Sequence, residues 1–179
     1  MLASEFLDWI DRAPLGQRVT ATRALCRFYL QGDADAGVQI AIEAALTLLL
    51  DDPSPEIRHA LAEVLGPSPA APHHIVISLA VDQPEIAATV LARSPLLIDA
   101  ELVDIAAAGT PLLQTAIAER QIVSSAVAAA LAEVGERNAL LTLLGNPAAA
   151  IARISFRRIA ERFADDADMR DLMLMRPDL

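Results

Sequence analysis

Lysine is absent from this 179-residue sequence, and aromatic residues make up only 3% of it. All 14 basic residues are arginines, and 24 acidic residues give the chain a formal net charge of -10. Dedicated nucleic-acid-binding proteins present a basic surface to the phosphate backbone, so this balance argues against that class. The shortage of aromatic rings also argues against a platform on which unpaired bases stack.

Cysteine occurs once, at Cys26, which excludes an intramolecular disulfide and a zinc site built from cysteines. Long apolar runs are missing too, since the densest, residues 44–50, spans seven positions and includes a threonine. A membrane-spanning helix needs about 20 apolar residues, so we expect none. The first residues lack the features of a signal peptide. We therefore expect a cytoplasmic protein, and interpret the chain as a fragment or the first domain of a longer protein.

The residues that are abundant favour helices. Hydrophobic residues make up 54% of the chain, alanine and leucine dominate them, and β-branched residues are scattered rather than alternating. The clearest predicted helix covers residues 55–65, where the apolar side chains recur at helical spacing. Ser54 is placed to cap this helix, Pro55 suits its first position and Gly66 follows its end.

The same start recurs along the chain, at Pro55, Pro84, Pro111 and Pro147, which are 29, 27 and 36 residues apart. The predicted helices after the last three prolines cover residues 86–92, 112–118 and 149–163. Partner helices are predicted at 73–81, 101–108, 124–134 and 138–144, and three helices upstream at 5–12, 15–30 and 36–50. A spacing of about 30 residues per helix pair indicates a stacked helical-repeat array.

One segment carries a more specific pattern. Asp52 and Pro53 form a turn, and an acid, Ile57, Arg58 and an alanine-leucine helix follow. This segment resembles the second helix of a HEAT repeat. Later units depart from the pattern, because Ala87 stands where the arginine would be. The whole chain also resembles a bacterial family of uncharacterised proteins with degenerate HEAT-like helices, most clearly in residues 51–65, 92–97 and 158–163.

The resemblance implies an all-α fold, an α-solenoid of short HEAT-like helical pairs with about a dozen helices. An irregular multi-helix bundle is the alternative. We predict one helical-repeat domain over residues 1–179. Residues 1–35 would form N-terminal capping helices, residues 36–165 the HEAT-like array and residues 166–179 a C-terminal helix.

Candidate chemical groups are few. We expect Arg58 to be structural and to pair with Asp51, Asp52 or a nearby loop carbonyl. His73 and His74 are adjacent and cannot share one helical face, so no metal site is expected. Cys26 is interpreted as a small buried side chain rather than a reactive thiol. The sequence has no phosphate loop and no nucleophile elbow. We therefore predict a non-catalytic protein without a cofactor.

Charge is uneven along the chain. Residues 1–90 hold 5 arginines and 12 acids, whereas residues 91–179 hold 9 arginines and 12 acids. Four arginines crowd one predicted helix: Arg153, Arg157, Arg158 and Arg162. One interpretation is a solvated helix face with internal ion pairs. The other is a docking patch for an acidic partner or for a following domain, since the planar guanidinium suits interfaces.

HEAT-like arrays generally act as binding scaffolds, so the resemblance implies a protein-protein interaction or regulatory module. Two alternatives remain, a HEAT-like DNA-repair glycosylase or other enzyme of this architecture, and a small-molecule sensor domain. The charge and the scarcity of aromatic residues argue against the glycosylase. We expect a protein partner, no nucleic acid and no membrane span; the sequence leaves the oligomeric state open.

Overall fold

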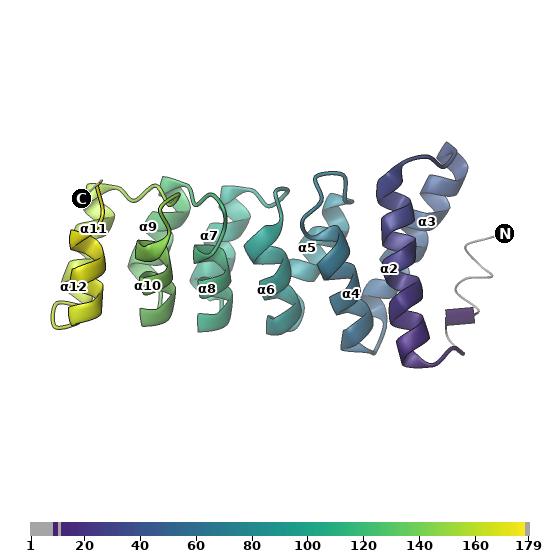
Figure 1. Ribbon diagram of the computed structural model, residues 1–179, viewed down its shortest axis with the longest axis horizontal. Coiled ribbons are helices and arrows are strands. Elements are labelled where there is room, and N and C mark those ends of the chain that lie inside the picture. Colours follow the sequence, from purple (N-terminus) through teal and green to yellow (C-terminus); the bar gives the residue numbers. More distant parts are fainter. Residues whose placement is uncertain (1–8, 11, 178–179) are drawn as a thin grey trace. The chain divides into compact units, whose positions relative to one another are not determined.

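The computed structural model describes residues 9–10 and 12–177, and within them the chain is all-α (Figure 1). The helices are α2 (Leu15–Gln31), α3 (Ala36–Leu48), α4 (Pro55–Leu65), α5 (His73–Ala80), α6 (Pro84–Arg93), α7 (Asp99–Ala108), α8 (Pro111–Ala118), α9 (Ser125–Val134), α10 (Arg137–Gly145), α11 (Arg153–Arg162) and α12 (Ala167–Leu174). A short 3-10 helix, η1 (Leu49–Asp51), follows α3. The helix predicted at residues 5–12 lies largely outside the described residues. No described helix is long and apolar enough to cross a bilayer.

The described residues divide into two compact units. Unit 1 comprises the chain up to residue 90 together with residues 94–96, and unit 2 comprises residues 91–93 and the chain from residue 97 onward. The boundary therefore falls in the last turn of α6 and the loop that follows it. The predicted division into residues 1–35, 36–165 and 166–179 stays a prediction.

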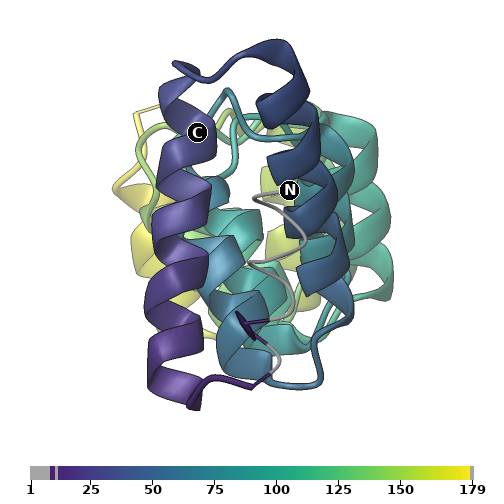
Figure 2. The same ribbon diagram turned by 90° about the vertical axis from the view of Figure 1, so that its right-hand side faces the viewer.

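In unit 1, α2 packs against both α3 and α4. Figure 2 shows α2 and α3 running in opposite directions, joined by a short loop. Gly32 ends α2 with a φ of 71°, a left-handed conformation that favours glycine. Asp35 then begins α3 by accepting a hydrogen bond from the N–H of Val38. The core contains the fully buried side chains of Cys26, Leu46, Ile57, Leu61 and Leu65.

In unit 2, every second helix packs side by side, so that two layers form (Figure 1). One layer contains α7, α9 and α11, and the other contains α8, α10 and α12. This alternation is consistent with the solenoid-like stacking that the proline spacing predicts. The loops that lead into α9 and α11 are linked by a parallel bridge between Val123 and Ala149, in which the N–H of Ala150 donates to the carbonyl of Val123.

A repeated polar contact stabilises the layer of unit 2 that contains α8, α10 and α12. In each case a residue one or two positions after a helix of this layer donates a hydrogen bond to a carbonyl at the C-terminal end of the preceding helix in the layer, counting α6 as the first. Arg120 binds the carbonyl of Leu91, Asn146 binds that of Ala118, and Arg176 binds that of Leu144. These carbonyls lack partners within their own helices, so the contacts satisfy groups that every helix end leaves open.

The predicted helix boundaries hold to within about two residues for most elements, but the prediction of a helix over 149–163 is wrong at its start. Although alanines favour a helix there, α11 begins only at Arg153. Residues 149 and 150 instead bond to the preceding loop through Val123. Ser54 also differs from expectation. It occupies the first cap position of α4, but its side chain makes no capping hydrogen bond.

Candidate functional site

Helix α11 carries the four arginines that the sequence singles out. Its apolar side, with Phe156 and Ile159, is buried against the rest of unit 2. The arginines occupy the remaining sides, because residues four apart in a helix share a face whereas adjacent residues do not. The four therefore have different surroundings, although they lie within ten consecutive residues.

Arg158 and Arg162 are engaged with neighbouring groups of unit 2. The Nε of Arg158 donates to Glu133 at 2.8 Å, and its Nη1 lies 3.6 Å from Glu161. Arg162 donates to the carbonyl of Ala132 in the last turn of α9, at 2.7 Å, and to that of Gly135 directly after the helix, at 2.8 Å. A cation at the C-terminal end of a helix complements the helix dipole. These two arginines therefore join α11 to α9.

Arg153 and Arg157 are both exposed and have no ion-pair or hydrogen-bond partner within the part of the chain that the structure describes. Together with Phe156, Ala160 and Met173 they line a pocket of about 300 Å³ between α11 and α12. The walls thus combine two guanidinium groups with apolar side chains. We call these five residues the α11–α12 pocket.

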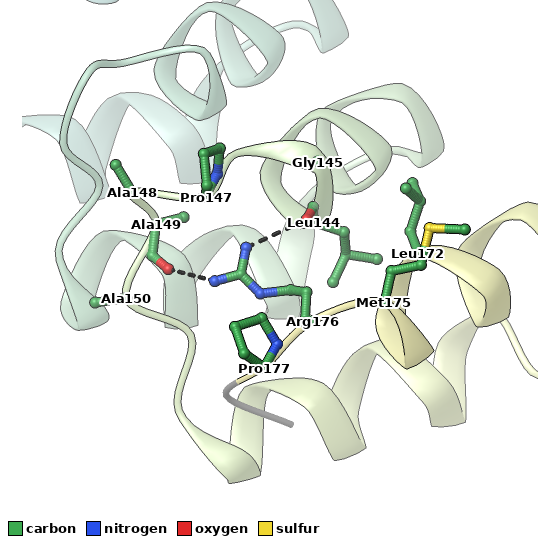
Figure 3. Close-up of a pocket in the computed structure, with 10 residues that line it drawn as sticks. All are labelled: Leu144, Gly145, Pro147, Ala148, Ala149, Ala150, Leu172, Met175, Arg176 and Pro177. Atoms are coloured by element: carbon green, nitrogen blue, oxygen red, sulfur yellow. Dashed lines mark hydrogen bonds between the residues drawn. The ribbon is translucent and has the colours of Figure 1, made fainter.

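A larger pocket lies at the C-terminal end of α12, beside the loop that follows α10 (Figure 3). It measures about 570 Å³ and is lined mainly by apolar side chains, with Leu172 and Met175 among them. Arg176 is the charged residue of this lining, and Figure 3 shows its guanidinium directed at main-chain carbonyls. It donates to the carbonyls of Leu144, Asn146 and Ala149. Since this guanidinium already holds the loop together, the pocket lacks an available charged anchor among its lining residues.

The segment that resembles a HEAT repeat serves packing. Ile57 is fully buried, Pro53 is exposed in the turn, and the Asp52 carboxylate accepts hydrogen bonds from Arg18 and from the N–H of Ser54. Arg58 donates to the carbonyl of Asp52 at 2.6 Å, which is the kind of loop partner expected.

The carboxylate partner of Arg58 is Asp82, which the sequence did not single out. Two parallel bonds join them, Nε to Oδ2 at 2.7 Å and Nη2 to Oδ1 at 3.0 Å. Burial raises the pKa of Asp82, but the hydrogen bonds from Arg58 and from the N–H of Gln83 outweigh it, so the pKa lies below its ordinary value. The pairing links the turn before α4 to the turn before α6.

The remaining candidate groups are occupied or buried. The Nε2 of His59 lies 3.5 Å from Glu63, and the Nε2 of His74 lies 3.0 Å from the hydroxyl of Thr47. Burial raises the pKa of the Cys26 thiol to about 12. Among the described residues, no three histidine, cysteine, aspartate or glutamate side chains gather as a metal site would require.

Three lining residues of the α11–α12 pocket, Phe156, Ala160 and Met173, were not predicted. Phe156 belongs to the apolar stripe of α11 and could have been found from its position between Arg153 and Arg157. Met173 could not, because the side of α12 that meets α11 depends on tertiary packing.

The fold is thus an all-helical one in which unit 2 stacks helix pairs and carries a small pocket flanked by arginines. Residues 86–179 match a family described as uncharacterised proteins conserved in bacteria (DUF2336), and because this match covers more than half of the chain, the protein belongs to that family. The matched segment contains α11 and α12. Searches among curated proteins and among solved structures found no match.

Proposed function

We propose that this protein is a non-catalytic, cytoplasmic HEAT-like repeat module that binds a protein partner through the surface of α11. The HEAT-like part of the proposal is supported by two features. Helices of unit 2 alternate between two layers. Arg58, at the arginine position of the motif, contacts the turn before its own helix and the turn before α6.

The non-catalytic part is supported by the state of the candidate groups. A catalytic thiol is usually accessible and has a lowered pKa, whereas Cys26 is fully buried and its pKa is raised. Asp82, which could act as a base, is instead engaged with Arg58 in a contact between two turns of unit 1. Such a pair has structural value.

One observation carries the interaction role. Of the four arginines on α11, Arg158 and Arg162 bind groups of their own unit, whereas Arg153 and Arg157 bind none within the described residues. An exposed arginine contributes little to the stability of the fold. Arginine is favoured in interfaces, however, because its planar guanidinium pairs with carboxylates in two parallel bonds. The unengaged pair is therefore the part of the predicted patch that is available to a partner.

Affinity capture from the source cell tests the proposal when wild type is compared with two double variants. We expect Arg153→Glu with Arg157→Glu to lose a partner that wild type retains in stoichiometric amount. Arg27→Glu with Arg93→Glu is the matched control, since both residues are exposed and the change in net charge is the same. Retention of every captured protein by the Arg153 and Arg157 variant would overturn the proposal.

A further inference from the structure

The α11–α12 pocket combines charge and apolar surface in a way that specifies its ligand. Arg153 and Arg157 stand one helical turn apart, a separation of roughly 6 Å between Cβ atoms. Phe156 lies between them in sequence and is almost fully buried, and Met173 closes the pocket from α12. A ligand here would meet two cations together with apolar atoms of the other lining residues.

The size of the pocket limits what can enter it. A volume of about 300 Å³ lies at the small end of the range for ligand pockets, which is roughly 300 to 1,000 Å³. A cofactor would overfill it, whereas a side chain of a bound protein segment would fit. The described residues of the lining include no carboxylate, so nothing in the pocket competes for the two guanidinium groups.

Charge distribution favours a protein segment over a phosphate-rich surface. A membrane or a nucleic acid would present many phosphates to the whole chain, whose net charge of -10 opposes such contact. A short acidic segment carries fewer negative charges, so the net charge of the chain repels it less while its carboxylates still meet the local pair of arginines. Its apolar side chain would gain from contact with Phe156 and Met173.

We infer that the α11–α12 pocket binds an acidic protein segment that places carboxylates on Arg153 and Arg157 and one apolar side chain between them. The inference rests on the proposed function and adds the chemistry of the partner. Carboxylates one helical turn apart would match the two arginines, so a helical segment with acids at positions i and i+4 fits best.

Selection of displayed random peptides on the purified wild-type chain tests this inference. We expect the enriched peptides to carry two acids close to a leucine, phenylalanine or methionine. A selected peptide should bind the Arg153→Glu, Arg157→Glu variant at least about tenfold more weakly, and the Arg27→Glu, Arg93→Glu control with unchanged affinity. Its affinity should fall as salt rises.

A second pair of changes addresses the apolar anchor. Ala160→Phe fills the pocket from an exposed position and keeps every charge, and replacing the apolar residue of the peptide by alanine removes the anchor from the other side. Each change should weaken binding about tenfold. The peptide change is measured on the wild-type chain, so it tests the apolar anchor even if Ala160→Phe misfolds.

The outcomes separate the two proposals. Loss of binding on reversing Arg153 and Arg157, with no effect of either anchor change, would overturn the inferred chemistry and leave the proposed function standing. The inference would be overturned if binding of the enriched peptides did not depend on either arginine, or if no peptide were enriched. Partner capture tests the proposed function independently. Arginine-dependent binding to vesicles containing phosphatidylserine, without peptide enrichment, would overturn the inference and indicate that the ligand is a membrane and not a protein segment.

Discussion

The side-chain amide of Asn146, directly after α10, donates to the carbonyl of Ala118 at the end of α8, at a distance of 2.9 Å. Its second N–H donates to the carbonyl of Arg120 at 2.8 Å, while its Oδ1 accepts from the N–H of Ala148. The Asn146 side chain therefore supplies hydrogen bonds to carbonyls at the end of α8 and also shapes the turn that follows α10.

Replacing Asn146 by alanine should lower the free energy of unfolding by about 1 to 3 kcal/mol, because partly buried carbonyls would lose their donors. Urea denaturation followed by circular dichroism measures the change. Asn146→Asp is the informative control, since it keeps the acceptor for Ala148 but turns a carboxylate toward two carbonyls. We expect it to destabilise at least as much; a loss below about 0.5 kcal/mol in both variants would contradict a structural role.

A second prediction concerns pH and the pair formed by Arg58 and Asp82. The pKa of Asp82 is lower in the folded chain than the ordinary value of about 3.9 expected after unfolding. Its contribution to stability is therefore fully present above that ordinary value and is lost as pH falls through the folded pKa. Wild type should be more stable than Asp82→Asn at neutral pH, and the difference should shrink below about pH 4.

Urea denaturation of both proteins across this pH range provides the measurement. Asp33→Asn is the matched control, because Asp33 is exposed and has no partner among the described residues. Its difference from wild type should stay close to zero throughout. A difference between wild type and Asp82→Asn that grows as the solution is acidified would have the wrong sign and refute the assignment.

The same pair illustrates how far the sequence could predict this molecule. Helix 55–65 was predicted because its apolar spacing, its proline start and its terminal glycine agree with one another. The sequence also predicted that Arg58 pairs with Asp51, Asp52 or a nearby loop carbonyl, and the carbonyl of Asp52 is one partner that the structure shows. The sequence could not choose Asp82 as the carboxylate, because that choice depends on how the turn before α6 comes to lie beside α4.

The start of α11 shows the converse error. Local preference for helix across residues 149–152 is overridden by contacts with the preceding loop, about one repeat earlier in the chain. The candidate patch divides for a similar reason. The four arginines of α11 are the same residue type, so the sequence does not distinguish them. Only the position of α9 determines that Arg158 binds Glu133 and that Arg162 binds the carbonyls of Ala132 and Gly135.

A third prediction concerns the thiol. Cys26 is fully buried in α2, and burial raises its pKa to about 12, so hardly any thiolate exists near neutral pH. Labelling by a thiol-reactive dye should be slow in buffer and should reach one equivalent once the chain is unfolded in denaturant. The unfolded sample serves as the control for reagent activity. Rapid labelling of the folded chain would show that this part of unit 1 opens readily.

The last prediction separates the two halves of the arginine patch by their effects on stability. Arg162→Ala removes the charged donor from two carbonyls at the C-terminal end of α9, and should lower the free energy of unfolding by about 1.5 to 3 kcal/mol. Arg157→Ala removes an exposed side chain without a described partner, and should change it by less than about 0.5 kcal/mol. Urea denaturation of the two variants gives both values.

Binding should follow the opposite order. Arg157→Ala should weaken the selected acidic peptide, whereas Arg162→Ala, measured where it is still folded, should bind it nearly as well as wild type. The opposition matters because a general loss of structure would lower stability and binding together. If Arg157→Ala instead destabilised the chain as strongly as Arg162→Ala, Arg157 would have an intramolecular role, and the surface of α11 would lose half of its available charge for a partner.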